Sequence, residues 1–577
     1  MAIAFGREGV LAPLESETVE FEGKAKSFRA GEIEAGDFRA WRLARGIYGQ
    51  RQADNQMMRI KIPFGGLNAD QLDVVGDLAE NFAGSGKGHI TTRQNIQLHF
   101  CKLEVVPEMM RRLATVGLTT REACSNTVRN VTACPLAGVD PTEAFDVTPY
   151  AAAFARYFLR KPENQALPRK FKVAFSGCAE DCVVLGIHDI GHQAVIKDGV
   201  KGFRVVAGGG TSTMPRKAPV IREFVSTDEY LLLAEAILAV FDKTGNRKNK
   251  NSARMKFVIE KIGFEAFKTM VDEELAKLGD KRVDLEPLMS LPSEEDVLPE
   301  AVPLADPIPG YEQWRRTNVT PQKQAGYLAA YVTVPTGDLY PEHLRGLADV
   351  SRRHNGGLVR TTITQNIVLR WLREEQLPAL HRDLFELGLG GPGARTLTDV
   401  VSCPGATSCS LAITASIELA RYGLAPKVSE VLERYPEAEG VSIKISGCPN
   451  GCGQHHLGAI GFEGASTKQS LLQVPSYEVW LGGGNTPDGL RIGKRAGKVA
   501  AKKAPLVVEK LVATYSAEKT ASESFYNWID RTGIDRLKAL VAEFHDVGPL
   551  HKELDSYKDW GSDEIYSVIR GEGECAA

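Results

Sequence analysis

The stretch Ile90-Thr-Thr-Arg-Gln-Asn-Ile-Gln-Leu98 returns 271 residues later as Thr361-Thr-Ile-Thr-Gln-Asn-Ile-Val-Leu369. Further along, Ser176-Gly-Cys178 returns 270 residues later as Ser446-Gly-Cys448. Motifs that recur in the same order at nearly one offset indicate an internal duplication. We therefore expect two similar halves related by a pseudo-twofold axis.

Each half is predicted to contain a short module followed by a larger one. Periodicity and turn residues favour a small antiparallel α+β unit for each short module, and the two units could pair into one larger sheet. The predicted strand, helix and strand are Met58–Pro63, Ala69–Phe82 and His89–Phe100 in the first half, and Tyr331–Val334, Pro341–Arg353 and Leu358–Trp371 in the second.

Four cysteines of the second half carry the strongest chemical signal. Cys403 and Cys409 are six residues apart, and Cys448 and Cys452 are four apart. Two such pairs on turns rich in Pro and Gly can offer four thiolates to one iron–sulfur cluster. Disulfides are disfavoured in a reducing compartment, and zinc ribbons usually use closer pairs. A redox cluster is therefore the favoured interpretation.

The first half keeps only part of this pattern. Cys134, Cys178 and Cys182 match ligand positions of the second half, but Asp140 stands where the fourth cysteine would be. This arrangement could be the relic of a second cluster site, or a site with three thiolates and one carboxylate. We favour the relic, because buried free cysteines pack as small apolar groups.

Composition and charge favour a soluble globular enzyme. The chain has 577 residues, 43% of them hydrophobic and 25% charged, with a net charge of -3. That charge gives no support for binding nucleic acid. The longest apolar stretch, 231–241, is too short to span a bilayer, and no export signal is evident at the N-terminus. We expect a cytoplasmic protein with neither nucleic acid nor membrane as partner.

Cationic residues of the first half have two possible interpretations. Lys170 and Lys172 are two apart on a predicted strand and so project from one face. Arg59 lies in another predicted strand, and Arg129 lies shortly before Cys134. They could be solvated surface charges, which most Lys and Arg residues are. Their apolar neighbours favour an anion pocket instead.

These motifs together resemble the sulfite and nitrite reductases that contain sirohaem and a 4Fe–4S cluster. The resemblance covers nearly the whole chain and rests on 58–61, 91–94, 128–131, 167–172 and both cysteine pairs. It implies that Cys403, Cys409, Cys448 and Cys452 bind the cluster, with Cys452 shared with the sirohaem iron. It further implies that Arg59, Arg129, Lys170 and Lys172 surround the substrate, and that the tetrapyrrole is held by Thr91, Arg93, Gln97, Arg169 and Asn450.

The implied fold is α+β: two pseudo-symmetric halves, each a small ferredoxin-like module plus a larger sirohaem and iron–sulfur module, in a three-lobed single chain. The expected segments are an extended N-terminal arm (1–44), ferredoxin-like half-domain 1 (45–118), the sirohaem and substrate module (119–279), a linker (280–318), ferredoxin-like half-domain 2 (319–394), the 4Fe–4S and sirohaem module (395–550) and a C-terminal tail (551–577).

The implied activity is the six-electron reduction of sulfite to sulfide, with nitrite reduction to ammonia as the alternative. Nitrite reductases of this family commonly have Asn at the position of Lys172, and sulfite gains more from an extra cation because it carries two charges. A single fused chain favours the assimilatory type. The electron donor would be a separate ferredoxin or flavoprotein, because no flavin or NADPH module is evident. A cluster protein without catalysis is the rival, but it would leave the four cations unexplained.

Several other features have weaker interpretations. The basic run 246–250 with Arg254 and Lys256 could dock an acidic electron donor, or could be a solvated start of a helix. His455 and His456 could relay protons or bind a metal, although simple burial or exposure is favoured. The tail is expected to be mobile, and its Cys575 is given no role.

Overall fold

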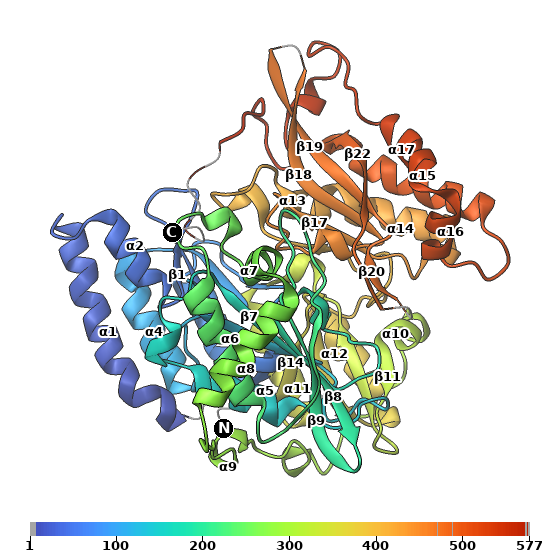
Figure 1. The fold of residues 1–577 in the computed structure, drawn as a ribbon. Coiled ribbons are helices and arrows are strands. Elements are labelled where there is room, and N and C mark those ends of the chain that lie inside the picture. Colours follow the sequence, from blue (N-terminus) through green and yellow to red (C-terminus); the bar gives the residue numbers. More distant parts are fainter. Residues whose placement is uncertain (1–6, 470, 487–488, 570, 572–573, 575–577) are drawn as a thin grey trace.

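The computed structural model describes residues 7–469, 471–486, 489–569, 571 and 574. In this part of the chain, four five-stranded sheets with their helices form two similar halves (Figure 1). The predicted α+β fold with two repeated modules in each half is therefore confirmed. Cys575 lies outside the described residues.

The small modules form two sheets of matching strand order. The predicted helices appear as α3 (Ala69–Asn81) and α11 (Pro341–Asn355). The first sheet runs β1 (Ile47–Gly49), β2 (Gln56–Ile60), β5 (Ile96–Cys101), β4 (Gly88–Ile90) and β13 (Asp338–Leu339). The second runs β11 (Val319–Pro321), β12 (Leu328–Val332), β15 (Ile367–Leu372), β14 (Leu358–Thr361) and β3 (Gly66–Asn68).

Each small sheet is completed by a strand from the other half. Strand β3 of the first half pairs with β14, and β13 of the second half pairs with β4. The expectation of one larger sheet is wrong, because the exchanged strands close two separate sheets. The exchange ties the halves together through backbone hydrogen bonds, which side-chain patterns do not encode.

The two long strands predicted at 89–100 and 358–371 are each a hairpin. The repeated stretch forms the turn, and its glutamine has a positive φ in both copies, 55° at Gln94 and 68° at Gln365. A tight turn closes from Thr91 N to Asn95 O at 2.8 Å, and its counterpart closes at 2.9 Å. The sequence did not predict these turns, because the apolar residues on both sides of each turn resemble one continuous strand.

The two repeated glutamines also connect each turn to its surroundings. Gln94 donates to Thr361 O of the other half at 2.8 Å and accepts from Ala133 N at 2.9 Å. Gln365 donates to Ile90 O of the first half at 2.8 Å and accepts from Ser402 N at 2.8 Å. Each glutamine thus holds the pseudo-twofold interface and fixes the strand end that precedes a cysteine.

Each larger module contains its own mixed sheet of the same design. In each sheet the first three strands are parallel to one another, and the fourth and fifth pair antiparallel with their neighbours. In the first half the order is β6 (Val128–Ala133), β7 (Phe171–Ser176), β8 (Ile190–Lys197), β9 (Val200–Ala207) and β10 (Val220–Ser226). In the second it is β16 (Val401–Ser402), β17 (Ile443–Ser446), β18 (Ile460–Gln469), β19 (Leu472–Leu481) and β22 (Lys494–Ala500). A separate hairpin joins β20 (Gly484–Thr486) and β21 (Gly489–Arg491).

Hydrophobic burial divides the molecule unevenly. One continuous core spans both small modules and the larger module of the first half. The larger module of the second half has its own core and stands apart as the orange and red lobe of Figure 1. Its main helices are α14 (Ala425–Arg434), α15 (Ala504–Glu518), α16 (Phe525–Thr532) and α17 (Ile534–Ala542). The first larger module is covered by α5 (Thr148–Phe158), α6 (Tyr230–Thr244), α7 (Met255–Ile262) and α8 (Phe264–Lys277).

The terminal segments differ from expectation. The N-terminal arm is helical, not extended: α1 (Arg7–Arg29) packs on α4 (Val106–Thr115), and α2 (Ala35–Leu43) follows it. At the other end, Gly571 N donates to Ser410 O at 3.0 Å, and Glu574 accepts from Arg42 at 2.8 Å. The described part of the tail therefore docks against both halves.

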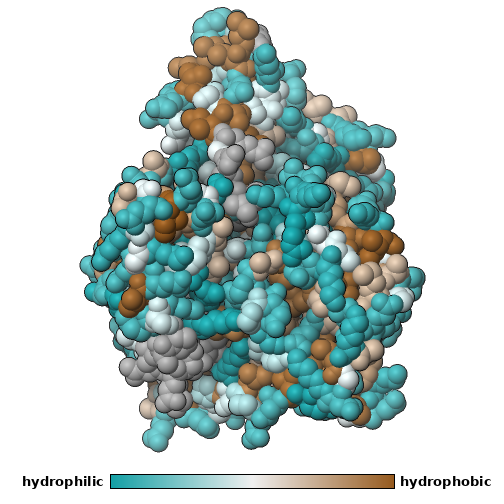
Figure 2. All heavy atoms as spheres, turned by 60° about the vertical axis from the view of Figure 1, so that its left-hand side comes forward, coloured by the Kyte–Doolittle hydropathy of each residue, from teal (hydrophilic) through white to brown (hydrophobic). Residues whose placement is uncertain are grey.

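The surface drawn in Figure 2 is mainly hydrophilic, with apolar residues in small scattered groups. No helix among the described residues has the length and apolarity needed to cross a bilayer.

Candidate active site

A cavity of about 190 Å³ lies between the halves, and all of the predicted site residues line it. The four cysteines come from the second half, and nearly all of the predicted polar residues come from the first. Its walls include Arg59, Thr91, Arg93, Gln97, Arg129, Arg169, Lys170, Lys172, Cys403, Cys409, Cys448, Asn450 and Cys452.

Two neighbouring parallel strands position the cysteine turns. Cys403 follows β16 directly, and Cys448 lies two residues beyond β17. Because these strands are parallel, their carboxyl ends meet at one sheet edge. Gly447 N donates to Cys403 Sγ at 3.3 Å, so a backbone N–H already faces a ligand sulfur. Burial, followed by the charges of the other three cysteines, raises the pKa of Cys448 well above its ordinary value.

Glycine is sterically required where the turns approach one another. A Cβ at Gly453 would lie 1.8 Å from Ile445 O. Gly405 has a φ of 61°, and its Cβ would lie 2.4 Å from Ser416 N. Neither site can accept another residue without movement of the backbone.

The first half clamps both cysteine turns. Arg51 donates through its guanidinium to Ala412 O at 2.7 Å and through its backbone N–H to Ser408 O at 3.1 Å. Thr92 Oγ1 donates to Cys452 O at 2.7 Å. Sequence reasoning missed both Arg51 and Thr92. For Thr92 a signal existed, since the matching residue of the repeat is Ile363.

The cations that line the first-half side of the cavity, here called the cation wall, are Arg59, Arg93, Arg129, Lys170 and Lys172. Two of its arginines converge on one carbonyl. Arg59 and Arg129 donate to Ala123 O at 3.3 and 3.0 Å. With its amide oxygen facing Arg59, Gln97 accepts from Arg59 Nε at 2.9 Å and donates to His99 Nε2 at 3.1 Å. Gln97 therefore contacts Arg59, which is expected to bind the substrate. Holding two like charges this close is costly unless an anion accompanies them.

Arg93 extends the wall from the turn of the repeated stretch. It donates to Val173 O at 3.1 Å and also to Asn130 O. Burial, followed by the charge of Arg129, lowers the pKa of Arg93 to about 9. The guanidinium remains charged at neutral pH.

Lys172 completes the wall and is held by a buried ion pair behind it. Asp189 accepts from Lys172 N at 2.8 Å and from Arg254 Nη2 at 2.7 Å. Burial, followed by the charges of Arg254 and Arg93, lowers the pKa of Lys172 well below its ordinary value.

The docking interpretation of Arg254 and Lys256 is therefore wrong. Arg254 is 7% exposed, and Lys256 is 2% exposed. Lys256 donates instead to the carbonyls of Thr211, Thr213 and Met214. The burial of these two side chains could not be predicted from their place on a basic segment, because it is decided by tertiary packing.

His455 and His456 are buried beyond the last cysteine, with ring centroids 3.8 Å apart. His455 Nε2 lies 3.3 Å from Glu463 Oε2. Burial lowers the pKa of both imidazoles. Burial of both histidines agrees with the favoured interpretation, and the alternative of a relay or metal role is untested.

Two family models together match most of the chain. Residues 124–278 and 393–546 match the model of the nitrite and sulphite reductase 4Fe-4S domain. Residues 48–116 and 320–387 match the nitrite/sulfite reductase ferredoxin-like half domain. The chain belongs to the nitrite and sulfite reductase family. Its cofactors are a 4Fe–4S cluster and sirohaem.

Named relatives of this nitrite and sulfite reductase fall into both activities. The chain is 31% identical to a ferredoxin–nitrite reductase of Synechococcus elongatus, over 74% of this chain and 80% of that protein. It is 29% identical to a sulfite reductase [ferredoxin] of Mycobacterium tuberculosis, over 84% and 83%. The solved structure of the Mycobacterium tuberculosis NirA protein superposes with a TM-score of 0.74 at 27% identity, covering 88% of this chain and 92% of that one.

The cavity walls fit both cofactors of this reductase. Four cysteines on one side supply the thiolates that a cube requires. The cations on the other side can form charge-assisted hydrogen bonds with a tetrapyrrole that carries eight carboxylates. The residues therefore match the chemistry of the groups that the family binds.

Proposed function

We propose that this protein is an assimilatory sulfite reductase. In the reaction, six electrons and seven protons convert sulfite to hydrosulfide and three waters. The observation that carries this proposal is Lys172, which lines the cavity together with Arg59, Arg129 and Lys170.

The balance of charge favours sulfite over nitrite. Burial, followed by the charges of Arg254, Arg93 and Lys170, lowers the pKa of Lys172, so repulsion among the cations adds to the effect of burial. A divalent anion relieves more of this repulsion than a monovalent one, because the Coulomb energy scales with the product of the charges. Lys172 therefore supports sulfite as the preferred substrate.

The cations would act at different stages of the reduction. Arg59 and Arg129 hold fixed orientations through Ala123 O and would bind the oxygens of the anion. A lysine with a lowered pKa gives up a proton more readily, so Lys172 would donate protons to oxygens that leave as water. Lys170, also in the wall, would assist.

Thr91, Arg93, Gln97, Arg169 and Asn450 would hold sirohaem, while Cys403, Cys409, Cys448 and Cys452 would hold the cluster. When bound, sirohaem would supply the iron site and the cluster would supply single electrons, with Cys452 proposed as a ligand of both. The protein contributes orientation, charge and protons.

The names of both relatives support ferredoxin as the electron donor, with a flavoprotein as the alternative. Nitrite remains the alternative substrate, favoured by the cyanobacterial relative. The cytoplasmic location and the segment boundaries stay predictions.

Replacing Lys172 tests the choice of substrate. Lys172→Asn should lower kcat/KM for sulfite by roughly tenfold more than for nitrite, because one interaction with a doubly charged anion is lost. Steady-state assays with reduced methyl viologen as donor measure both ratios. Lys172→Arg, which keeps the charge, and Lys261→Asn on the exposed surface of α7 serve as controls.

Equal losses for the two substrates would remove the basis for sulfite. A larger loss for nitrite would reverse the assignment. Either result would leave the family membership untouched.

A further inference from the structure

The first half contains a second group of convergent cysteines that the proposed function does not use. Cys134 follows β6 directly, Cys178 lies two residues beyond β7, and Cys182 lies four residues further on. They match Cys403, Cys448 and Cys452 in the repeat.

The backbone around this group repeats that of the cluster-binding turns. Cys134 N donates to Phe175 O at 3.2 Å, and Cys403 N donates to Ile445 O at 3.3 Å. One residue beyond β7, Gly177 O accepts a backbone hydrogen bond at 3.0 Å, as its counterpart beyond β17 does at 2.7 Å. The turns that aim ligand sulfurs in the second half are therefore present in the first.

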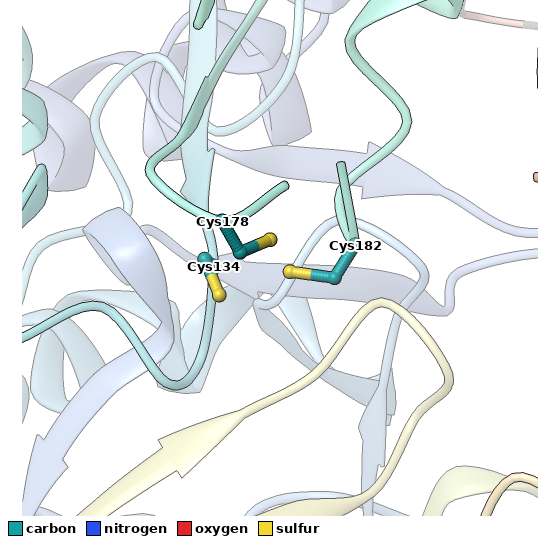
Figure 3. A group of neighbouring side chains, drawn as sticks. All are labelled: Cys134, Cys178 and Cys182. Carbon is teal, nitrogen blue, oxygen red and sulfur yellow. The ribbon is translucent and has the colours of Figure 1, made fainter. Parts of the chain in front are cut away.

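The three sulfurs point into one small space. All lie within 4.8 Å of one another, and Figure 3 shows Cys178 and Cys182 facing each other with Cys134 beside them. Thiolates bound to a single ion at about 2.3 Å lie about 3.8 Å apart in tetrahedral geometry. A shift of less than about 1 Å would thus convert this group into a coordination site.

The space between the three sulfurs suits one metal ion and not a 4Fe–4S cluster with a tetrapyrrole. Among the described residues, no three of the four cluster cysteines lie as close together as this group does. The face that opens into the cavity in the second half is filled here by an apolar cluster that includes Val183, Leu185 and Ile363. Ile363 stands at the position that matches Thr92. Cys182 packs against this apolar cluster, whereas the matching Cys452 is exposed.

The alternative of a site with three thiolates and one carboxylate, which the sequence left open beside the favoured relic, does not fit the geometry. Asp140 is outside the convergent group, and its Oδ1 accepts from Thr142 N at 2.8 Å. Cys134 and Cys178 are 1% and 2% exposed, while Cys182 is half-buried and gives an ion access from solvent.

We propose that Cys134, Cys178 and Cys182 bind a single thiophilic metal ion as three thiolates, with a solvent molecule as the fourth ligand. Binding releases the thiol protons to solvent and involves no redox step. The ion ties the end of β6 to the turn after β7 and braces the larger module of the first half. This site is independent of the substrate and of the cofactors in the cavity.

The test uses the reduced holoenzyme with Zn²⁺ as the probe. After anaerobic incubation with ZnCl₂ and desalting, we expect about one zinc per chain by elemental analysis, in addition to the iron of the cofactors. Zinc-edge X-ray absorption should show three sulfur neighbours at about 2.3 Å, a readout that the iron does not disturb. Cys178→Ser and Cys182→Ser should each reduce retention at least tenfold, while Cys101→Ser, a buried cysteine outside the group, should retain zinc.

If both serine variants retain as much zinc as the wild type, the zinc is bound elsewhere and the proposal is overturned. Absence of retention would overturn it as well, as would a disulfide within the group in the freshly reduced protein. Should the serine variants fail to fold, the absorption spectrum of the wild type alone decides, because fewer than three sulfur neighbours contradicts the proposed site.

Discussion

Single residues decide how the two halves share one active site. Thr92 is the clearest case, since its hydroxyl donates to Cys452 O from the opposite half at 2.7 Å. It is 7% exposed, so removing the hydroxyl would leave a carbonyl without its donor in a protected position. Thr92 thereby positions Cys452, the cysteine that we propose is shared between cluster and sirohaem.

Thr92→Val should lower kcat several-fold with little change in KM, because the clamp acts on Cys452 and not on the anion. The electron paramagnetic resonance of the coupled cofactors should shift as well. Thr92→Ser keeps the donor and should restore both properties. A valine variant with the kcat and spectrum of the wild type would show that the hydrogen bond has no positioning role.

The candidate site residues were predictable from sequence as a set, because the motifs that carry them resemble the family's motifs in order. All of them line one cavity, as described above. What could not be predicted was the support behind them, such as Asp189 beneath Lys172, since its partners lie far away in the chain. The roles of the individual residues remain predictions.

Among the elements, the linker between the halves is held more firmly than its composition suggested. Glu294 pairs with Arg360 and Arg370, which lie on β14 and β15. Although burial opposes ionisation, these two charges lower the pKa of Glu294 from its ordinary 4.5 to about 2. The arginines are 6% and 5% exposed in their side chains, so they depend on this carboxylate.

Glu294→Gln should lower the free energy of unfolding at pH 7 by about 3 kcal/mol, because two buried cations lose their partner. The folded pKa is depressed, so the stabilisation is complete above pH 4.5 and is lost as the pH falls towards 2. The wild type and the variant should therefore converge across that window in urea unfolding. Glu295→Gln, at an exposed neighbouring position, is the matched control. A constant difference between pH 5 and pH 2 would contradict the ion pair.

Secondary structure was predictable where hydrophobic periodicity was strong. It was not predictable for the short strands that pair across the two halves. Helices α3 and α11 begin and end close to their predicted limits. The exchange of β3 and β13 between halves was not predictable, because a strand of two or three residues carries too little pattern to reveal its partner.

At the scale of the whole molecule, duplication supplies one scaffold and divergence supplies the chemistry. The second half keeps four cysteines around the cavity, and the first half supplies the cation wall. Pseudo-twofold symmetry brings these two contributions together because each half completes the other's small sheet. The same symmetry was visible in the sequence, whereas the filling of the equivalent cavity in the first half was not.

We propose that this divided cavity reduces sulfite in preference to nitrite. Anaerobic steady-state reduction of each anion by the cofactor-loaded protein, with sulfide and ammonia quantified against electrons consumed, tests it most directly. We predict six electrons per sulfide and a higher kcat/KM for sulfite than for nitrite. A higher kcat/KM for nitrite, or sulfite consumption without stoichiometric sulfide, would show that sulfite is not the preferred substrate.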